Sequence, residues 1–159
     1  MSFATADLYD QHEHRLQVLE PILSDYGGQR RFSGPIATVK VFEDNGLVRA
    51  ALEEPGGGKV LVVDGGGSLR CALVGDKLTE LASRNGWGGL VVYGSIRDAA
   101  AIAKIPIGLK AVNTTPRKSA KRGAGDRDIP VQFAGVTFTP DWFLYADEDG
   151  VLVSEQPLA

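Results

Sequence analysis

Short apolar runs alternate with polar, helix-like stretches in the middle of the chain. The runs occupy residues 60–64, 90–93 and 107–111, and glycine-rich breaks border the first two. The first two runs are nearly uninterrupted, which is typical of strands buried on both faces of a sheet, and residues 107–111 resemble a third strand. Residues 78–84 and 97–103, which lie between the runs, have the composition of short helices. The alternation predicts parallel strands joined by helices.

Three further segments with secondary structure are expected before these strands. Residues 7–25 place leucine and isoleucine among polar residues at a loose helical spacing that Pro21 interrupts, which predicts one or two short helices. β-branched residues dominate 36–42, which predicts a strand. Residues 47–53 are expected to form a helix, because a Pro-Gly-Gly-Gly stretch follows them.

The last third of the chain is typical of antiparallel β structure. A loop containing proline, lysine and arginine is expected at 113–128, and an Asp-Gly turn at 149–150 separates the last two strands. The predicted strands are 130–133, 136–138, 142–146 and 151–153. All these elements together predict an α/β fold in a single domain spanning residues 1–159, with a central sheet flanked by helices.

Composition narrows the class of protein. The chain has 159 residues, 43% hydrophobic and 23% charged, which suits one globular domain and excludes a disordered chain. A net charge of -3 argues against direct nucleic-acid binding, which needs a strongly basic face. No run approaches the roughly 18 apolar residues of a membrane span, and no leader pattern opens the chain, so neither membrane contact nor export is expected. A single cysteine, Cys71, cannot form an internal disulfide, which favours a reducing cytoplasm.

Glycine is unusually frequent: 20 of the 159 residues are glycine, about 13%, whereas an average protein has roughly 7%. The Gly65-Gly66-Gly67-Ser68 stretch follows an apolar run and predicts a tight turn. Its backbone amides could also face a substrate carboxylate, because glycine lets the main chain approach an anion. Nucleotide-binding glycine patterns are not complete here, since the last glycine of G-x-G-x-x-G is missing.

Asp76 and the pair Arg97-Asp98 are the strongest candidates for chemistry. Twenty residues separate Asp76 from Arg97, and each position follows one of two neighbouring predicted strands. Parallel pairing would bring the three side chains to one edge of the sheet, where ligands bind in open α/β folds. An acidic residue at a helix start also has a purely structural explanation, because it stabilises the positive end of the helix dipole.

Several strings of the sequence, in order along the chain, resemble those of one known family. They are Phe42-Glu43-Asp44-Asn45, residues 62–68, Asn85-Gly86-Trp87, residues 133–138 and residues 145–150. With them the chain resembles the family of the regulator of ribonuclease E activity A and its divalent-metal-dependent relatives, the 4-hydroxy-4-methyl-2-oxoglutarate aldolases. The aldolase branch is marked by Asp, twenty residues, then Arg-Asp, a pattern that Asp76, Arg97 and Asp98 satisfy.

The resemblance implies a fold, an assembly and a reaction. The fold would be a swivelling β/β/α domain, assembled as a homotrimer or a dimer of trimers with sites at subunit contacts. The reaction would be cleavage of 4-hydroxy-4-methyl-2-oxoglutarate-type 2-keto acids to pyruvate. Oxaloacetate decarboxylation is implied as a side activity, because it gives the same enolate of pyruvate.

The resemblance also implies roles for single residues. Asp98 would ligate the divalent cation, Mg²⁺ or Mn²⁺, and Arg97 would contact the keto-acid oxygen. Asp76 would orient a water for proton transfer. A metal ion and a fixed cation suit this chemistry because the enolate carries negative charge on oxygen. The substrate-binding residues would be Gly75, Asp76, Lys77, Leu78 and Arg97.

Two rival functions stay open. A protein of this family could bind and inhibit ribonuclease E without catalysing anything, although such a protein has no need of the Asp, Arg, Asp arrangement. A Schiff-base aldolase would use a lysine such as Lys77, Lys104 or Lys110, but the sequence gives no sign of the buried setting that would lower a lysine pKa.

The remaining charged and aromatic candidates have ordinary structural explanations. His12 and His14 are expected on the surface, and Trp87, Trp142 and Tyr145 in the core or at a subunit contact. One basic cluster stands out, and it predicts a solvated loop or, alternatively, a contact to an anionic substrate, RNA or a partner. Its members are Arg117, Lys118, Lys121, Arg122 and Arg127.

Overall fold

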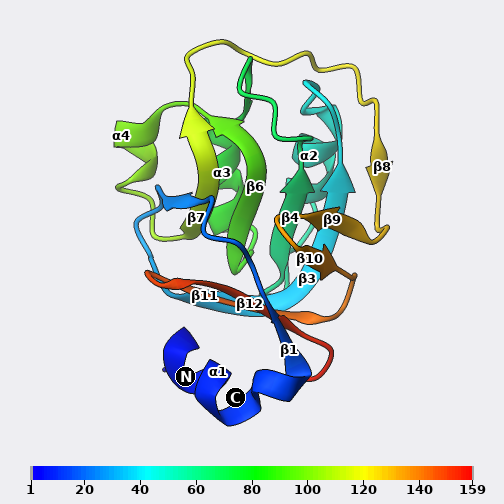
Figure 1. Cartoon of the computed structure of the whole chain (residues 1–159). Coiled ribbons are helices and arrows are strands. Elements are labelled where there is room, and N and C mark those ends of the chain that lie inside the picture. Colours follow the sequence, from blue (N-terminus) through cyan, green and yellow to red (C-terminus); the bar gives the residue numbers. More distant parts are fainter. Residues whose placement is uncertain (1, 159) are drawn as a thin grey trace.

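The computed structural model describes residues 2–158 (Figure 1). Its helices are α1 (Thr5–His12), the 3-10 turn η1 (Glu13–Arg15), α2 (Gly46–Leu52), α3 (Asp76–Arg84) and α4 (Ala99–Ile102). Its strands are β1 (Leu16–Val18), β2 (Ser24–Asp25), β3 (Phe32–Lys40), β4 (Val60–Asp64), β5 (Ala72–Val74), β6 (Gly89–Ile96), β7 (Gly108–Thr114), β8 (Asp126–Arg127), β9 (Val131–Phe133), β10 (Val136–Phe138), β11 (Phe143–Asp147) and β12 (Gly150–Ser154).

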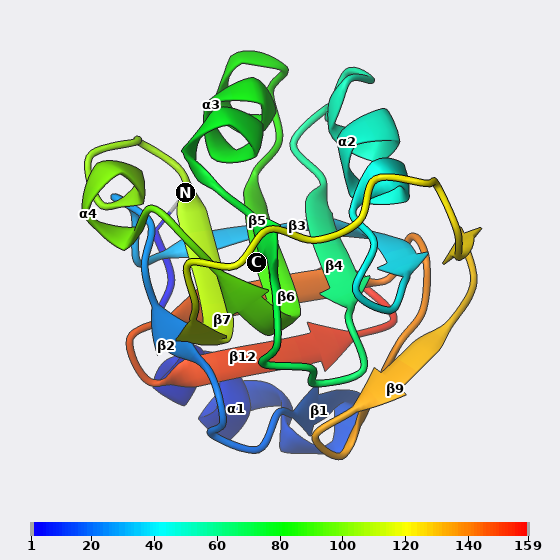
Figure 2. The ribbon, with the colours of Figure 1, turned by 90° about the horizontal axis from the view of Figure 1, so that it is seen from above.

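Four parallel strands form the centre of the main sheet, in the order β3-β4-β6-β7. Helices α2, α3 and α4 cover one face of these strands (Figure 2). Alternation along β4 explains why its apolar run is continuous. Leu61 and Val63 pack with the helices, whereas Val60 and Val62 pack on the opposite face with the C-terminal strands.

Strand β3 joins the parallel strands to an antiparallel part of the same sheet. Residues 32–35 of β3 pair with β11, and residues 36–40 pair with β4. Beyond β11 the order continues with β12 and β1, both antiparallel to their neighbours. Strands β11 and β12 therefore cross beneath the parallel strands, with α1 outside them (Figures 1 and 2).

Three separate hydrophobic clusters lie between these layers. The first lies between the helices and the parallel strands and includes Leu52 and Leu90. The second, around Phe138 and Leu144, lies between the parallel strands and the C-terminal strands. A small third cluster joins Leu8 of α1 to the antiparallel strands. The α/β expectation, with a central sheet flanked by helices, is therefore confirmed, and no helix within residues 2–158 is long and apolar enough to cross a membrane.

Several predicted elements differ from the observed ones. Helix is wrong for residues 16–25, where β1 and β2 are extended because they pair with β12 and β7. The strand predicted at 36–42 begins earlier, at Phe32, and ends at Lys40, whose partner Asp64 is the last residue of β4. The loop predicted at 113–128 contains the end of β7 and the short strand β8.

Strand β5 has no counterpart among the predicted elements. It lies between the glycine turn after β4 and the start of α3, and it pairs in parallel with the end of β6. Asp76 therefore follows β5 directly, and not the turn after β4. Since β5 and β6 run in the same direction, Asp76 and the Arg97-Asp98 pair still reach the same edge of the sheet.

Candidate active site

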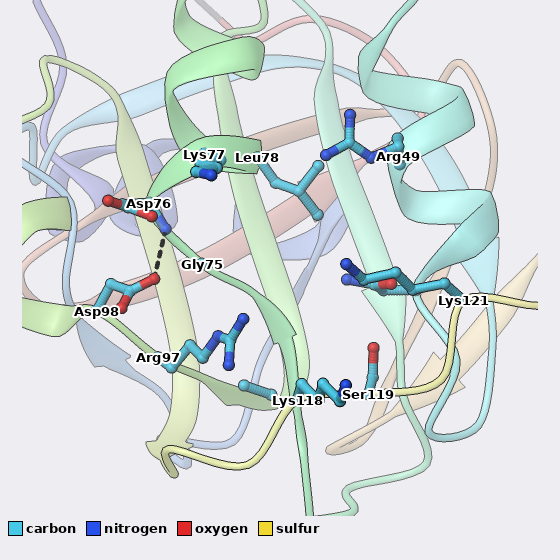
Figure 3. Close-up of a pocket in the computed structure, with 12 residues that line it drawn as sticks. Arg49, Gly75, Asp76, Lys77, Leu78, Arg97, Asp98, Lys118, Ser119 and Lys121 are labelled. Atoms are coloured by element: carbon cyan, nitrogen blue, oxygen red, sulfur yellow. Dashed lines mark hydrogen bonds between the residues drawn. The ribbon is translucent and has the colours of Figure 1, made fainter.

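A cavity of about 190 Å³ opens at this edge of the sheet (Figure 3). It contains all the residues that the motif and the resemblance single out. Its lining also includes residues from α2 and from the segment after β7. The lining residues are Asn45, Arg49, Ala72, Gly75, Asp76, Lys77, Leu78, Arg97, Asp98, Lys118, Ser119 and Lys121. Five of them are lysine or arginine and two are aspartate, so the cavity favours a small anion.

The start of α3 supplies backbone donors to the cavity. Gly75 is extended and precedes the helix, and Asp76 is its first residue. Amides in the first turn of a helix have no acceptor within the helix, and the helix dipole is positive there. The Asp76 amide donates to Asp98 Oδ2 at 3.1 Å. The amides of Lys77 and Leu78 belong to the same turn and suit a substrate carboxylate.

Asp98 is held against this turn by an unusual backbone conformation. Its φ of 64° and ψ of 39° are left-handed, which aspartate tolerates better than most residues. This conformation points the carboxylate back to the Asp76 amide. A β-carbon at Gly75 would lie 2.7 Å from Asp98 Oδ2, so only glycine leaves room for the carboxylate in this position.

Arg97 points its guanidinium into the cavity beside Asp98 (Figure 3). Its backbone amide donates to the Val74 carbonyl at 3.0 Å, which fixes the end of β6 against β5. The guanidinium makes one long contact, 3.4 Å from Nη1 to the Pro116 carbonyl. Within residues 2–158 it forms no ion pair, so its charge is available to a ligand.

Three further cations, which the motif does not include, line the cavity. Arg49 projects from α2, and Lys118 and Lys121 project from residues 117–123, which we call the basic loop. Lys118 and Lys121 are exposed, as expected of a solvated loop, and they also line the cavity. Arg127, the last member of the predicted cluster, instead forms a two-bond ion pair with Glu54, 3.0 Å for each bond.

Asp44 fastens the basic loop to the start of α2. Its buried carboxylate accepts hydrogen bonds from the amides of Gly46, Arg122 and Gly123 at 2.9 to 3.1 Å. Burial alone would raise the pKa of Asp44, but these amide donors outweigh it and hold the pKa below the ordinary value of 3.8. The loop that bears Lys118 and Lys121 is thus fixed to the core.

The glycine turn at 65–68 is not an anion site. The amides of Gly65 and Gly67 donate to the Tyr93 carbonyl, and the amide of Gly66 donates to Asp64 Oδ1. The Ser68 hydroxyl donates to Glu43, which also pairs with Arg70 at 2.6 Å. The hydrogen bonds from Ser68 and Arg70 lower the pKa of Glu43. The turn is therefore a structural feature.

One expectation about the lysines needs correction. Lys110 is only 3% exposed, and its Nζ lies 3.0 Å from Asp25 Oδ1, in ion-pair contact without the alignment of a hydrogen bond. Lys110 is therefore buried after all, but it lines a different cavity, next to Asp25. Lys77 and Lys104 are exposed. Among residues 2–158, no lysine is both buried and part of the candidate active site.

Other candidates behave as ordinary structural residues. Trp87 and Tyr145 are buried, as expected, and Trp142 is partly buried against the second cluster. His14 is exposed and His12 half-buried. The Cys71 thiol is buried, and burial raises its pKa, which makes it a poor nucleophile.

A metal ion at this site would need few protein ligands. No group of three His, Cys, Asp or Glu side chains in the described part of the chain could hold one. Asp98 presents a carboxylate fixed over Gly75, with Asp76 in the same cavity. One carboxylate with water and substrate oxygens is a common arrangement for Mg²⁺, so the residues fit a hard divalent cation.

Sequence comparison finds relatives over the whole chain. The family described as RraA-like, Aldolase/RraA, matches residues 5–153. A protein of Aromatoleum aromaticum is 60% identical over 158 residues, and one of Burkholderia multivorans is 59% identical over 163 residues. Each alignment covers 99% of both chains. Both relatives are named as candidate 4-hydroxy-4-methyl-2-oxoglutarate aldolases.

Solved structures give the same fold under other names. A Geobacillus kaustophilus protein named S-adenosylmethionine: 2-dimethylmenaquinone methyltransferase has a TM-score of 0.96 at 52% identity, covering 98% of this chain and 97% of its own. The RNA-processing inhibitor RraA from Thermus thermophilis has a TM-score of 0.96 at 47% identity, covering 100% of this chain and 96% of its own. The names describe three different activities, so the activity has to be argued from the site.

Proposed function

Because the chain belongs to the RraA-like family of aldolases and RraA proteins, we propose that it is a divalent-metal-dependent aldolase. It cleaves 4-hydroxy-4-methyl-2-oxoglutarate-type 2-keto acids to pyruvate and decarboxylates oxaloacetate at the same site. The observation that supports this proposal most directly is the meeting of Asp76, Arg97 and Asp98 in one positively charged cavity. A surface that only binds a partner has no need of this arrangement.

In the proposed binding mode, separate donors contact the C1 carboxylate and the C2 keto oxygen of the substrate. The C1 carboxylate lies at the start of α3, against the amides of Lys77 and Leu78. The Arg97 guanidinium then faces the C2 keto oxygen. When the C3–C4 bond breaks, its electron pair forms the enolate of pyruvate, and negative charge grows on that oxygen. Arg97 stabilises the charge where it develops, and this lowers the barrier.

Asp76 assists the proton transfers. As the C3–C4 bond breaks, the C4 hydroxyl becomes a carbonyl and releases its proton. Asp76 accepts this proton through a bridging water, because a carboxylate within reach of one water is a competent general base. The proton is later returned to C3 of the enolate. For 4-hydroxy-4-methyl-2-oxoglutarate both products are pyruvate.

Asp98 is the residue that would hold the metal ion. Its carboxylate is fixed by the Asp76 amide and by the absence of a side chain at Gly75. A bound Mg²⁺ or Mn²⁺ would supply Lewis-acid charge close to the keto oxygen. Arg97 lies next to Asp98 in sequence and in the cavity. The same short segment would therefore position the Arg97 guanidinium and the metal ion.

Inhibition of RNA processing is the second candidate function. It is favoured by the 47% identity and the matching fold of the Thermus RraA protein. Such a function would use an outer surface and leave the cavity idle. The two functions can also coexist in one chain, because they would use different parts of the molecule.

A steady-state assay tests the proposal. Pyruvate release from oxaloacetate and from 4-hydroxy-4-methyl-2-oxoglutarate is measured with Mg²⁺, with Mn²⁺ and after EDTA treatment. We expect release that EDTA abolishes and either metal restores. Activity that survives EDTA and is trapped by borohydride would replace the metal mechanism by a lysine one. No release under any condition, together with slowed cleavage by ribonuclease E, would favour the regulator.

A further inference from the structure

A second, open cavity of about 540 Å³ lies at the carboxyl ends of the parallel strands. Among residues 2–158, it shares no lining residue with the candidate active site. Asp64, the last residue of β4, lines it from the face of the sheet that also bears Val60 and Val62, opposite the helices. The carboxyl ends of parallel strands are a usual position for ligands, so this cavity is a candidate for a separate binding site.

Four neighbouring strands place polar residues in one row of this cavity. Lys40 of β3 pairs with Asp64 of β4, and Asp64 pairs with Tyr93 of β6. On its other side, Lys40 pairs with Asp126 of β8. Paired residues of adjacent strands lie on the same face of a sheet, and all four of these residues line the cavity. The row contains two carboxylates and one ammonium group, so it is negative overall.

Asp64 is the buried carboxylate that the protein satisfies least. Three aspartates among residues 2–158 are buried, namely Asp44, Asp64 and Asp147. The carboxylates of Asp44 and Asp147 each accept three hydrogen bonds. The carboxylate of Asp64, which is 6% exposed, accepts one, from the Gly66 amide to Oδ1, and forms no ion pair within the same residues. A buried charge with so few partners favours a ligand that brings a positively charged donor.

Aromatic rings line the same cavity. The ring of Tyr93 stacks on Phe133, with 4.6 Å between the centroids. Phe42 lies over Gly66, since a β-carbon there would be 3.0 Å from the Phe42 ring, and Gly66 is the residue whose amide binds Asp64. Aromatic faces attract organic cations and apolar chains. A metal ion is less suited, because no group of three His, Cys, Asp or Glu side chains in the described part of the chain could hold one.

We propose that this cavity binds the ammonium group of a small organic ligand, an amine or an amino acid with an apolar chain. The ammonium group donates to Asp64 Oδ2, and the apolar chain lies against Phe42 and Tyr93. In an amino acid the carboxylate faces Lys40, the cation next to Asp64 in the row. The inference does not depend on the proposed aldolase reaction, because the two cavities have separate linings.

A binding experiment tests this assignment. Ligands are titrated into the ¹⁵N-labelled protein, and the NMR signal of the Gly66 amide, which is bonded to Asp64, reports binding. We expect n-pentylamine to bind about 10- to 100-fold tighter than its uncharged counterpart 1-pentanol, the effect of a hydrogen bond to a charged group. Asp64→Asn keeps an acceptor for the Gly66 amide and should bring this ratio close to one. If L-norleucine binds tighter than pentylamine and Lys40→Met removes the difference, the ligand is an amino acid; otherwise it is an amine.

Asp128→Asn is the matched control, because Asp128 is exposed and does not line the cavity. It should keep the wild-type ratio. Asp126→Asn removes the exposed carboxylate of the row and should lower the ratio by a smaller factor, which tests the inference even if Asp64→Asn fails to fold. The inference is overturned if wild type does not prefer pentylamine to pentanol, if the Gly66 signal does not move, if folded Asp64→Asn keeps the full ratio, or if Asp128→Asn lowers it equally.

Discussion

A side chain at position 75 would collide with the carboxylate of Asp98, the proposed metal ligand. The distance from a β-carbon there to Asp98 Oδ2 would be 2.7 Å, closer than real carbon atoms approach. The φ of Gly75 is -123°, which any residue adopts, so the need for glycine at this position is steric and local. Three neighbouring features, the bare Gly75, the Asp76 amide and the left-handed backbone of Asp98, therefore fix one carboxylate.

Gly75→Ala should displace Asp98 and reduce activity without unfolding the protein. We expect a roughly 10- to 100-fold fall in kcat/KM for pyruvate release, because a shift of about 1 Å in a reacting group has effects of this size. Gly94→Ala is the matched control, since the nearest atom to its new methyl group would be a Leu73 methyl carbon at an ordinary 3.4 Å. Full activity in Gly75→Ala would show that the position of Asp98 is not critical.

Asp98→Ala and Arg97→Ala should fail in different ways. Loss of Asp98 weakens metal binding, so part of the lost pyruvate release should return at high Mg²⁺ or Mn²⁺ concentration. Loss of Arg97 removes a cation that faces the enolate, which should cost about 10²- to 10³-fold in kcat by analogy with other oxyanion donors. Excess metal should not restore it. Titration of each variant with metal measures the difference, and equal rescue of both would contradict the separate roles.

At the scale of elements, those whose structure depends on neighbouring residues were predicted, and those that depend on partners far along the chain were not. Strand β4 begins and ends where the apolar run 60–64 does. The strand is buried on both faces, so its consecutive residues are apolar and the pattern can be recognised locally. Strands β1 and β5 have only three residues each and owe their extended form to distant partners, β12 and β6, so local patterns miss them. The same holds at the cavity. The spacing between Asp76 and Arg97 covers one helix and one strand and predicts their meeting, whereas nothing local brings Lys121 to Arg49.

Asp44 makes this long-range placement of the basic loop testable. In Asp44→Asn an amide replaces a carboxylate that accepts three backbone hydrogen bonds, which should cost about 1–3 kcal/mol of unfolding free energy at pH 7. The folded-state pKa of Asp44 is lowered, so the stability due to its charge is complete above about pH 4 and is lost as the pH falls through the folded-state pKa. The difference between wild type and variant should therefore shrink at low pH.

Urea denaturation at pH 7 and at the lowest pH where both proteins fold measures this change. Asp126→Asn, at an exposed position on β8, is the control and should leave stability near the wild-type value at both pH values. The variant Asp44→Asn should also raise KM for dicarboxylic substrates, because the basic loop loses its attachment. A pH-independent difference in stability would show that the charge of Asp44 is not what holds the loop.

At the scale of the whole molecule, the sequence pattern predicts the layers of the fold but not how copies of the chain assemble. The apolar runs predict the central strands. The expectation of a homotrimer or a dimer of trimers comes from the family resemblance alone. Two exposed apolar side chains each lie three positions before a residue that lines the cavity: Phe42, 59% exposed, precedes Asn45, and Leu69, 50% exposed, precedes Ala72. Arg70 lies over the Phe42 ring, 5.6 Å from its centroid, and joins the two segments through Glu43. We propose that a homotrimer covers this apolar surface, with the cavity close to the subunit contact.

Sedimentation velocity at micromolar concentration should therefore give the mass of three chains, or of six for a dimer of trimers, and not that of one chain of 16.9 kDa. Phe42→Ser and Leu69→Ser each remove apolar area that the assembly would bury, so dissociation should begin at higher protein concentrations than in wild type. Val18→Ser is matched in exposure, at 51%, but lies on the edge strand β1, and it should leave the assembly intact. Pyruvate release should fall as trimers dissociate if the subunit contact shapes the cavity. A monomeric wild type, or equal dissociation of Val18→Ser, would contradict this assignment of the interface.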